Sequence, residues 1–282
     1  MSQVIFLQDF FVHQHLGGGE LHDAVVLKYF ESRGLLYDQI NTYNVTPEYI
    51  LKNTDKAWFI SNFVALKNVC KALLAKHCKY LIYEHDYKFL KNRNPIVYPN
   101  FIAPNEGHKH NFSFYQNAEK IICLSKFHKK IFDLNLGLPN IDNISCSMWS
   151  DEDLELMKSL NSGPKNGKHA VIQSGNKIKK TRETVDFCKK NGVEFDLIRA
   201  PDHHEFLKIL SRYQSLIFQT GHPEPTPRIA VEAKMLNCNF MSQKNLIGVA
   251  HEDWFHLNGN ALIKKARDMR DEACLKLESI LL

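Results

Sequence analysis

The chain has 282 residues, of which 44% are hydrophobic, so it is long enough for two domains that each bury a core. Its formal charge of +5 is mildly basic and suits a phosphate-bearing ligand, nucleic acid or an anionic membrane surface. Seven scattered cysteines form no C-x-x-C pair, which argues against a zinc knuckle or a disulfide framework and favours a reducing compartment. With no signal peptide and no run of roughly 20 apolar residues, we expect a cytoplasmic protein without a transmembrane segment.

The first expected elements are a strand, a glycine-rich loop and a helix. Val4–Leu7 is a short apolar run that predicts a central parallel strand. Gly17, Gly18 and Gly19 follow, and Glu20 opens a stretch in which apolar residues recur at helical spacing. Glycines let a ligand approach the backbone and a helix N-terminus attracts anions, so this loop is a candidate phosphate site. It is neither a dinucleotide-binding motif nor a P-loop, and a flexible connector is the alternative.

A pair of histidines, His13 and His15, precedes the glycines. In a strand this spacing places both imidazoles on one face, where they can hold a metal ion. No third ligand can be assigned from the sequence, so we predict no metal site and favour a role in lining a ligand cleft.

Three ionisable residues follow the next predicted parallel strands. The pattern predicts strands at 57–60 and 80–83 with a helix over 65–76 between them. Glu84, His85 and Asp86 stand at the end of the second strand, where open parallel sheets gather their ligands. His85 can donate a hydrogen bond to a substrate hydroxyl, and Asp86 can orient it or touch an acceptor. A cluster that caps the next segment is the alternative.

A long irregular loop over 87–111 carries Lys88, Lys91 and Arg93. Loops of this length in compact domains are often functional, so these cations are available to an anionic acceptor, although a solvated charge run is equally compatible. A strand over 120–124 and a helix capped by Ser125 then close the first half.

The domain boundary falls where apolar periodicity fades, between 145 and 167, which gives domains 1–150 and 151–282. Asp151-Glu152-Asp153 has the spelling of a metal-binding D-x-D motif, but after Ser150 it is more typical of a capped helix start.

The second half opens with a strand over 170–173, a turn at Gly175, and three lysines before a helix that starts near Thr181. Cations at this place would neutralise a diphosphate. Further strands are predicted at 195–198, 215–218 and 239–241, and further helices at 203–213 and 261–282. Because strands and helices alternate through both halves, we predict an α/β protein with a parallel sheet in each domain.

The stretch 219–240 joins a buried strand to an amphipathic helix through a loop rich in proline. We expect the helix to start near Arg228, with Thr226 as its cap and Pro227 at its first position. Glu224 and Glu232 frame the turn, with seven residues between them. A helix N-terminus flanked by two carboxylates suits a diphosphate that has hydroxyls on both sides, which describes a nucleotide sugar. The alternative is an ion pair of Glu232 with Arg228 on a solvated helix face.

The segment Glu224-Pro-Thr-Pro-Arg-Ile-Ala-Val-Glu232 resembles the E-x7-E motif of retaining GT-B glycosyltransferases of family four. The resemblance implies two Rossmann-like domains that face each other across a cleft, with the last helix crossing back to the first domain. It also implies that Glu224 contacts the donor sugar and Glu232 the ribose. The family's Gly-Arg is replaced here by Gly175-Asn176, and Lys180, with Lys177 second, is assigned to the diphosphate.

The predicted function is therefore a retaining, metal-independent glycosyltransferase that uses a nucleotide-diphosphate sugar, UDP- or GDP-linked. It needs no cofactor beyond this donor, and its acceptor is a glycan, lipid or protein, with peripheral membrane contact left open. The candidate catalytic residues are His85, Glu224 and Lys180. The candidate donor-binding residues are Gly18, Gly19, Glu20, Asp86, Lys177, Pro225, Thr226, Arg228 and Glu232.

Two other functions stay open. A phage-type glucosyltransferase that acts on DNA would use the basic loop at 88–93, but no patch interleaves aromatic and basic residues, so nucleic acid is disfavoured. A non-catalytic nucleotide-binding protein of the same fold is favoured by Asn176, which stands where the family has an arginine.

Overall fold

The structure is a computed structural model that describes residues 3–282. It divides into two compact units, one of Met1–Met148 with Met269–Leu282 and the other of Trp149–Asp268. We refer to them as the N-terminal unit and the C-terminal unit. The division falls within α10 (Gly259–Leu281), whose first residues belong to the C-terminal unit and whose last residues belong to the N-terminal unit.

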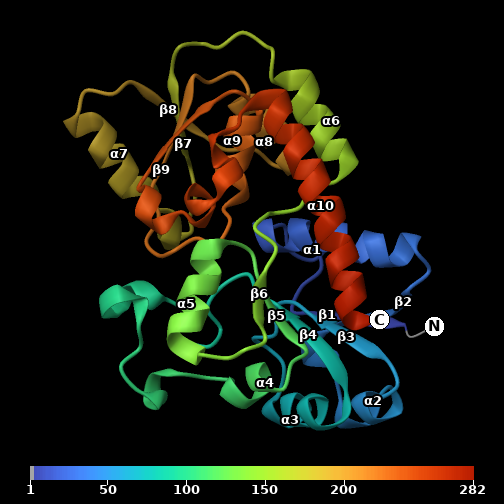
Figure 1. Cartoon of the computed structure of the whole chain (residues 1–282). Coiled ribbons are helices and arrows are strands. Elements are labelled where there is room, and N and C mark those ends of the chain that lie inside the picture. The colour runs from blue at the N-terminus through green and yellow to red at the C-terminus, as the bar shows by residue number, and fades with distance from the viewer. Residues whose placement is uncertain (1–2) are drawn as a thin grey trace. The chain divides into compact units, whose positions relative to one another are not determined.

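The N-terminal unit is built on six parallel strands in the order β2-β1-β3-β4-β5-β6. The strands are β1 (Val4–Gln8), β2 (Leu36–Asn41), β3 (Ala57–Ile60), β4 (Lys79–Tyr83), β5 (Lys120–Cys123) and β6 (Ile141–Asn143). The helices are α1 (Gly18–Ser32), α2 (Pro47–Lys52), α3 (Asn68–His77), α4 (Phe112–Gln116), α5 (Lys126–Leu136) and the end of α10. In Figure 1, α1 and the end of α10 lie on one side of this sheet, and α2 and α3 lie on the other.

The central strands β1 and β3 are buried on both faces of this sheet, since successive strand residues point to opposite sides and all of theirs are buried. Ile5 and Trp58 belong to the core that the sheet shares with α2 to α5. On the other face, Phe6 stacks on Phe59 with ring centroids 4.5 Å apart, and Phe30 of α1 packs edge-on against Phe59. Strands covered on both faces need no polar alternation, which explains the continuous apolar runs of β1 and β3.

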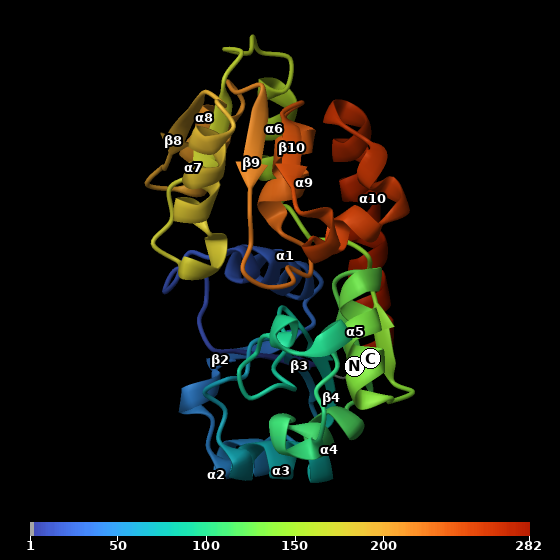
Figure 2. The ribbon, with the colours of Figure 1, turned by 90° about the vertical axis from the view of Figure 1, so that its left-hand side faces the viewer.

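The C-terminal unit has four parallel strands in the order β10-β9-β7-β8. The strands are β7 (His169–Ile172), β8 (Phe195–Ile198), β9 (Ser215–Phe218) and β10 (Asn239–Ser242). The helices are α6 (Asp151–Leu160), α7 (Thr181–Lys190), α8 (His203–Leu210), α9 (Arg228–Met235) and the start of α10. Figure 2 shows β9 beside β10, where Ser215 pairs with Asn239. Val171, Ile217 and Cys188 form a core between β7, β9 and α7.

The α/β class with two parallel sheets is confirmed, and the strands predicted as apolar runs are present. Pattern analysis missed β2, α2, α4 and β6. The edge strand β2 alternates half-buried and exposed residues, and β6 has only three residues, so neither forms an apolar run. The predicted helix over 65–76 begins later, at Asn68, because Lys67 is the N-cap of α3.

The start of α9 differs from the prediction. Pro227 is the N-cap and not the first helical residue, and no side chain caps the helix, so the cap assigned to Thr226 is wrong. Thr226 is instead buried.

None of the helices in the described part of the chain combines the length and apolar character that a membrane span requires.

Candidate functional site

His85 lies just after β4 and is held by an aspartate on α1. Its Nε2–H donates to Asp23 Oδ1 at 2.7 Å, and the other oxygen of Asp23 accepts from Ser61 Oγ at 2.5 Å. Burial lowers the pKa of His85, but the charge of Asp23 and this hydrogen bond outweigh burial and hold that pKa above 6.5. The structure thus assigns to Asp23 the orienting role that the sequence suggested for Asp86.

The predicted glycine loop forms the N-terminus of α1, next to His85. Gly17 is the N-cap with no side-chain cap bond, so the amides of Gly18 and Gly19 have no backbone partner within the helix. A Cβ atom added to Gly19 would lie 3.6 Å from His85 Cγ, an ordinary contact distance. Glu20 is partly buried, and this burial raises the pKa of its carboxyl group. Gly18, Gly19, Glu20 and His85 therefore gather at the carboxyl edge of β1 and β4.

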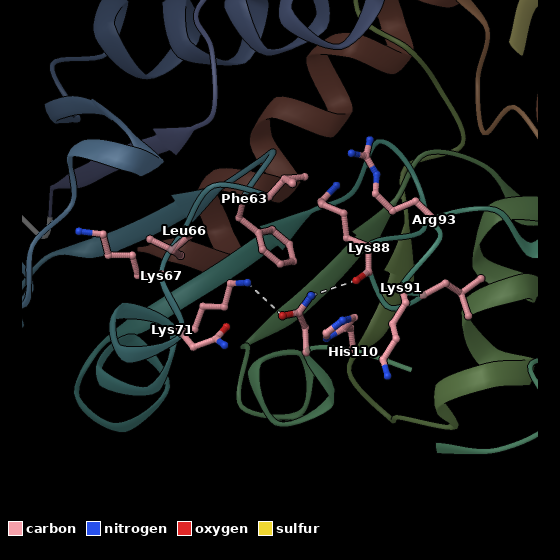
Figure 3. A pocket seen from close by; sticks show the side chains of 12 residues that line it. Phe63, Leu66, Lys67, Lys71, Lys88, Lys91, Arg93 and His110 are labelled. Atoms are coloured by element: carbon pink, nitrogen blue, oxygen red, sulfur yellow. Dashed lines mark hydrogen bonds between the residues drawn. The ribbon is translucent and has the colours of Figure 1, made fainter. Parts of the chain in front are cut away.

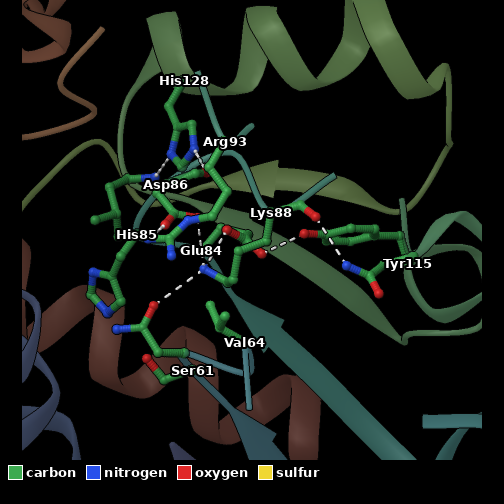
Figure 4. A network of polar contacts seen from close by, with 12 residues as sticks. Ser61, Val64, Glu84, His85, Asp86, Lys88, Arg93, Tyr115 and His128 are labelled. Carbon is green, nitrogen blue, oxygen red and sulfur yellow. Dashed lines mark hydrogen bonds and ion pairs between the residues drawn. The ribbon is translucent and has the colours of Figure 1, made fainter. Parts of the chain in front are cut away.

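A buried ionic network continues from His85 along the chain (Figure 4). Lys88 Nζ lies 2.8 Å from Glu84 Oε2 and 3.1 Å from Asp86 Oδ1, and Tyr115 donates to Glu84 Oε1 at 2.6 Å. Arg93 forms a second ion pair with Asp86. Burial raises the pKa of Asp86, but Lys88 and Arg93 outweigh it, so that pKa is lowered. Asp86 is thus an ion-pair partner of the basic loop.

His128 fixes the backbone of this segment in the neutral state. Its Nδ1 accepts from the Leu124 N–H at 3.2 Å, so its proton lies on Nε2, which donates to the Asp86 carbonyl oxygen at 2.8 Å. Burial lowers the pKa of His128 to about 3, so the ring stays uncharged at neutral pH.

In the C-terminal unit, the lysine loop after β7 meets the acidic turn after β9. The Gly221 N–H donates to the Ile178 carbonyl at 2.7 Å, and Lys179 Nζ lies 2.9 Å from Glu224 Oε1. The backbone of Glu224 pairs with the segment after β10 through bonds to Leu246 and Gly248. Two loops far apart in sequence thus place a carboxylate and an ammonium group together at the carboxyl edge of the sheet.

Lys179 is the lysine that pairs with Glu224, whereas the prediction from sequence favours Lys180 and Lys177 for this loop. Lys180 has a left-handed backbone at φ 48° and pairs with Glu183 at 2.6 Å. An added Cβ atom on Gly221 would nevertheless lie 2.9 Å from Lys180 Cε, so the stem of Lys180 runs beside the acidic turn. Lys177 opens a short 3-10 turn and is exposed.

Glu232 is almost fully buried in α9, and three groups converge on its Oε1. Trp149 Nε1 donates to it at 3.0 Å, His203 Nε2 at 2.9 Å, and Arg228 Nε lies 3.3 Å away. The Arg228–Glu232 pair that the spacing predicted therefore exists, but both side chains are buried and not on a solvated face. Pro225 and Thr226 are buried beside the same turn.

His203 bridges two carboxylates. Its Nδ1 lies 3.5 Å from Asp153 Oδ1, opposite the bond to Glu232. Burial lowers the pKa of His203, but the charge of Glu232 and the bonds to both carboxylates raise it to about 9. Asp153 also forms a capping box with Ser150. This agrees with the prediction that residues 151–153 start a capped helix.

Asp153, His203 and His204 each offer one ligand atom within 4.8 Å of the others, a spacing that a metal ion could use. A protonated His203 and the guanidinium of Arg228 near Asp153 both oppose a bound cation.

Sequence reasoning missed the residues that hold the candidate groups in place: Asp23, Trp149, Lys179 and His203. For Asp23 a signal existed, because the buried face of α1 runs through His22, Asp23, Val26 and Phe30. A carboxylate on the buried face of a helix needs a partner. The apolar residues whose helical spacing predicted this helix, Leu21, Ala24, Val25 and Tyr29, each lie one position away from a residue of that face.

No profile of a known protein family and no curated protein matches the sequence. Solved structures nevertheless match nearly the whole chain. The sucrose-phosphate synthase of Thermosynechococcus elongatus has a TM-score of 0.62 at 9% identity, over 99% of this chain and 98% of that one. HepE of Anabaena, solved with UDP and glucose, has a TM-score of 0.54 at 12% identity, over 99% and 100% of the two chains. The trehalose-6-phosphate synthase OtsA has a TM-score of 0.59 at 10% identity, over 99% and 91%.

These neighbours are GT-B glycosyltransferases, and the chain shares their fold of two parallel α/β sheets.

Proposed function

We propose that this protein is a glycosyltransferase that moves a sugar from a nucleotide-diphosphate sugar to an acceptor. The observation that carries the proposal is the meeting of the lysine loop and the acidic turn, where Lys179 lies 2.9 Å from Glu224. The fold supports it, since neighbours include HepE solved with UDP-glucose, at a TM-score of 0.51 and 13% identity. The resemblance to the E-x7-E motif extends the proposal to retention and to catalysis without a metal.

In this proposal the C-terminal unit binds the donor. Glu224 accepts hydrogen bonds from the donor sugar, and the lysines at 177–180 neutralise the diphosphate as the glycosidic C–O bond breaks. The known contacts of Glu232 converge on Oε1, so we assign its Oε2 to the ribose hydroxyls. Arg228, Pro225 and Thr226 then shape this pocket.

The N-terminal unit supplies His85 and the amides of Gly18 and Gly19. Because Asp23 holds Nε2 of His85, Nδ1 is the ring atom that we assign to the reacting sugar. A raised pKa keeps more of this ring protonated near neutral pH, which suits a donor of hydrogen bonds to a sugar hydroxyl. The acceptor oxygen forms the new bond to the anomeric carbon as the bond from that carbon to the phosphate oxygen breaks, and the acceptor's proton passes to the leaving nucleoside diphosphate.

The test compares Glu224→Ala with Glu194→Ala, a control at an exposed carboxylate of the same unit. Donor binding is screened by calorimetry with UDP- and GDP-sugars, and donor hydrolysis without acceptor gives the rate. We expect Glu224→Ala to lower kcat/KM at least tenfold, since a charged hydrogen bond contributes about 1.5–3 kcal/mol. Equal rates for Glu224→Ala and the wild type would remove the donor assignment. Tight donor binding with no turnover would favour the non-catalytic alternative.

A further inference from the structure

We propose that a cationic pocket in the N-terminal unit binds a phosphate monoester carried by the acceptor, an inference that rests on the proposed glycosyl transfer. The pocket has a volume of about 410 Å³ and lies beyond the carboxyl ends of β3 and β4. Its wall comes from two segments, one around Phe63 to Lys71 and one around Lys88 to Asn111 (Figure 3). This volume lies within the roughly 300–1,000 Å³ typical of small-molecule sites.

The wall carries five cationic side chains and no carboxylate. Glu84 and Asp86, which lie behind it, are engaged by Lys88 and Arg93. Among the described residues, the remaining cations of the wall, Lys67, Lys71 and Lys91, form no ion pair. The pocket wall therefore carries an excess of positive charge that no carboxylate of the wall itself neutralises.

Lys71 shows the excess of positive charge most clearly, because its side chain is half-buried and has lost part of its contact with water. Its Nζ donates to Asn111 Oδ1 at 3.0 Å, and it lies 5.3 Å from the centre of the Phe63 ring. Burial lowers the pKa of Lys71, and the charge of Asp9 opposes this only in part, so the charged form lacks a full replacement for its water. A bound anion would supply that replacement.

Further groups converge on the same place. Lys88 Nζ also lies 5.3 Å from the centre of the Phe63 ring, so two ammonium groups lie close to one aromatic ring. The helix α3 begins at Asn68 on the pocket wall with no side-chain cap, so its first amides add hydrogen-bond donors.

The positive charge of the pocket favours anions of higher negative charge. A phosphate monoester carries about −1.5 to −2 at pH 7, whereas a carboxylate carries −1. Three uncompensated lysines therefore match a phosphate ester better than a uronic acid or a neutral sugar.

The pocket adjoins the edge that holds His85. Lys88 donates to Asn62 Oδ1 at 3.3 Å, and Asn62 Nδ2 lies 3.7 Å from the position of an added Cβ on Gly19. Gly19 in turn packs against His85. An acceptor anchored by its phosphate would thus extend toward the proposed reacting group.

The test measures binding of glucose 6-phosphate, glucose 1-phosphate, glucose and inorganic phosphate to the full chain by calorimetry. The variants are Lys71→Gln and Lys91→Gln, and the control is Lys76→Gln, an exposed lysine on α3 outside the pocket. We expect a sugar phosphate to bind at least tenfold more tightly than glucose. Lys71→Gln should remove most of this difference in affinity, and added salt should weaken binding of the sugar phosphate.

UDP-glucose affinity is measured on the same proteins and separates the two proposals. Unchanged UDP-glucose binding with no preference for a sugar phosphate would overturn the pocket assignment alone. Inorganic phosphate that binds as tightly as any sugar phosphate would overturn the acceptor assignment. Binding of a sugar phosphate that depends on Lys71, in a protein that binds no nucleotide sugar, would support the pocket and remove the proposed function.

Discussion

The bridge that His203 forms between Asp153 and Glu232 makes a sharp prediction about stability. Replacing His203 with glutamine keeps a side chain that can donate to Glu232 but removes the titratable charge. The difference in unfolding free energy between the wild type and this variant should therefore depend on pH.

The size of the effect follows from the two pKa values of His203. Its pKa is 6.5 in the absence of partners and about 9 in the folded chain. At about 1.4 kcal/mol per pH unit, this rise corresponds to about 3 kcal/mol of stabilisation by the protonated ring. Because the folded pKa is the higher one, the contribution is fully present below pH 6.5 and is lost as the pH rises through about 9. Arg228 faces the same ring and works against its protonation.

The assay is urea unfolding at several pH values between 6 and 10 on both proteins. Two of the three tryptophans, Trp149 and Trp254, belong to the C-terminal unit, so fluorescence reports mainly on the unit that contains His203. Groups common to both proteins cancel in the difference. An NMR titration of the His203 ring gives the folded pKa directly.

We expect the difference between the wild type and His203→Gln to shrink by about 2–3 kcal/mol across this pH range. A difference that stays constant with pH, or a His203 ring that titrates near 6.5, would refute the argument that the two carboxylates hold the ring charged.

Two further predictions concern single contacts. Asp23→Asn should lower the pKa of His85, because the charge and hydrogen bond of Asp23 are the main causes that raise it. NMR should therefore show the His85 ring titrating at a lower pH, and the alkaline limb of the pH–activity profile should move to lower pH as well. An unchanged titration of His85 would contradict the pairing with Asp23. Ser150→Ala should destabilise the protein by about 1 kcal/mol in urea unfolding, since it breaks the capping box of α6, whereas the exposed Ser159→Ala should have little effect; equal stabilities would argue against the cap.

Much of the fold follows from local pattern. Strands such as β3 and β9 are covered on both faces, so their sequences are continuous apolar runs that stand out without any tertiary information. The glycine loop before α1 and the acidic turn before α9 stand out as well, because glycine and proline mark turns by their backbone restrictions. These local signals also place the ligand-binding candidates at strand ends.

The sequence by itself therefore determined the class of the fold and the segments that carry candidate groups, since both depend on neighbours in the chain. Only the tertiary structure decided which groups meet: that Asp23 and not Asp86 holds His85, that Lys179 and not Lys180 reaches Glu224, and that Glu232 is buried against Trp149 and His203. These contacts join residues 29 to 83 positions apart. No local periodicity spans such separations. Which distant residues meet depends on the order of the strands in the sheet and on the face of the helix on which each residue lies.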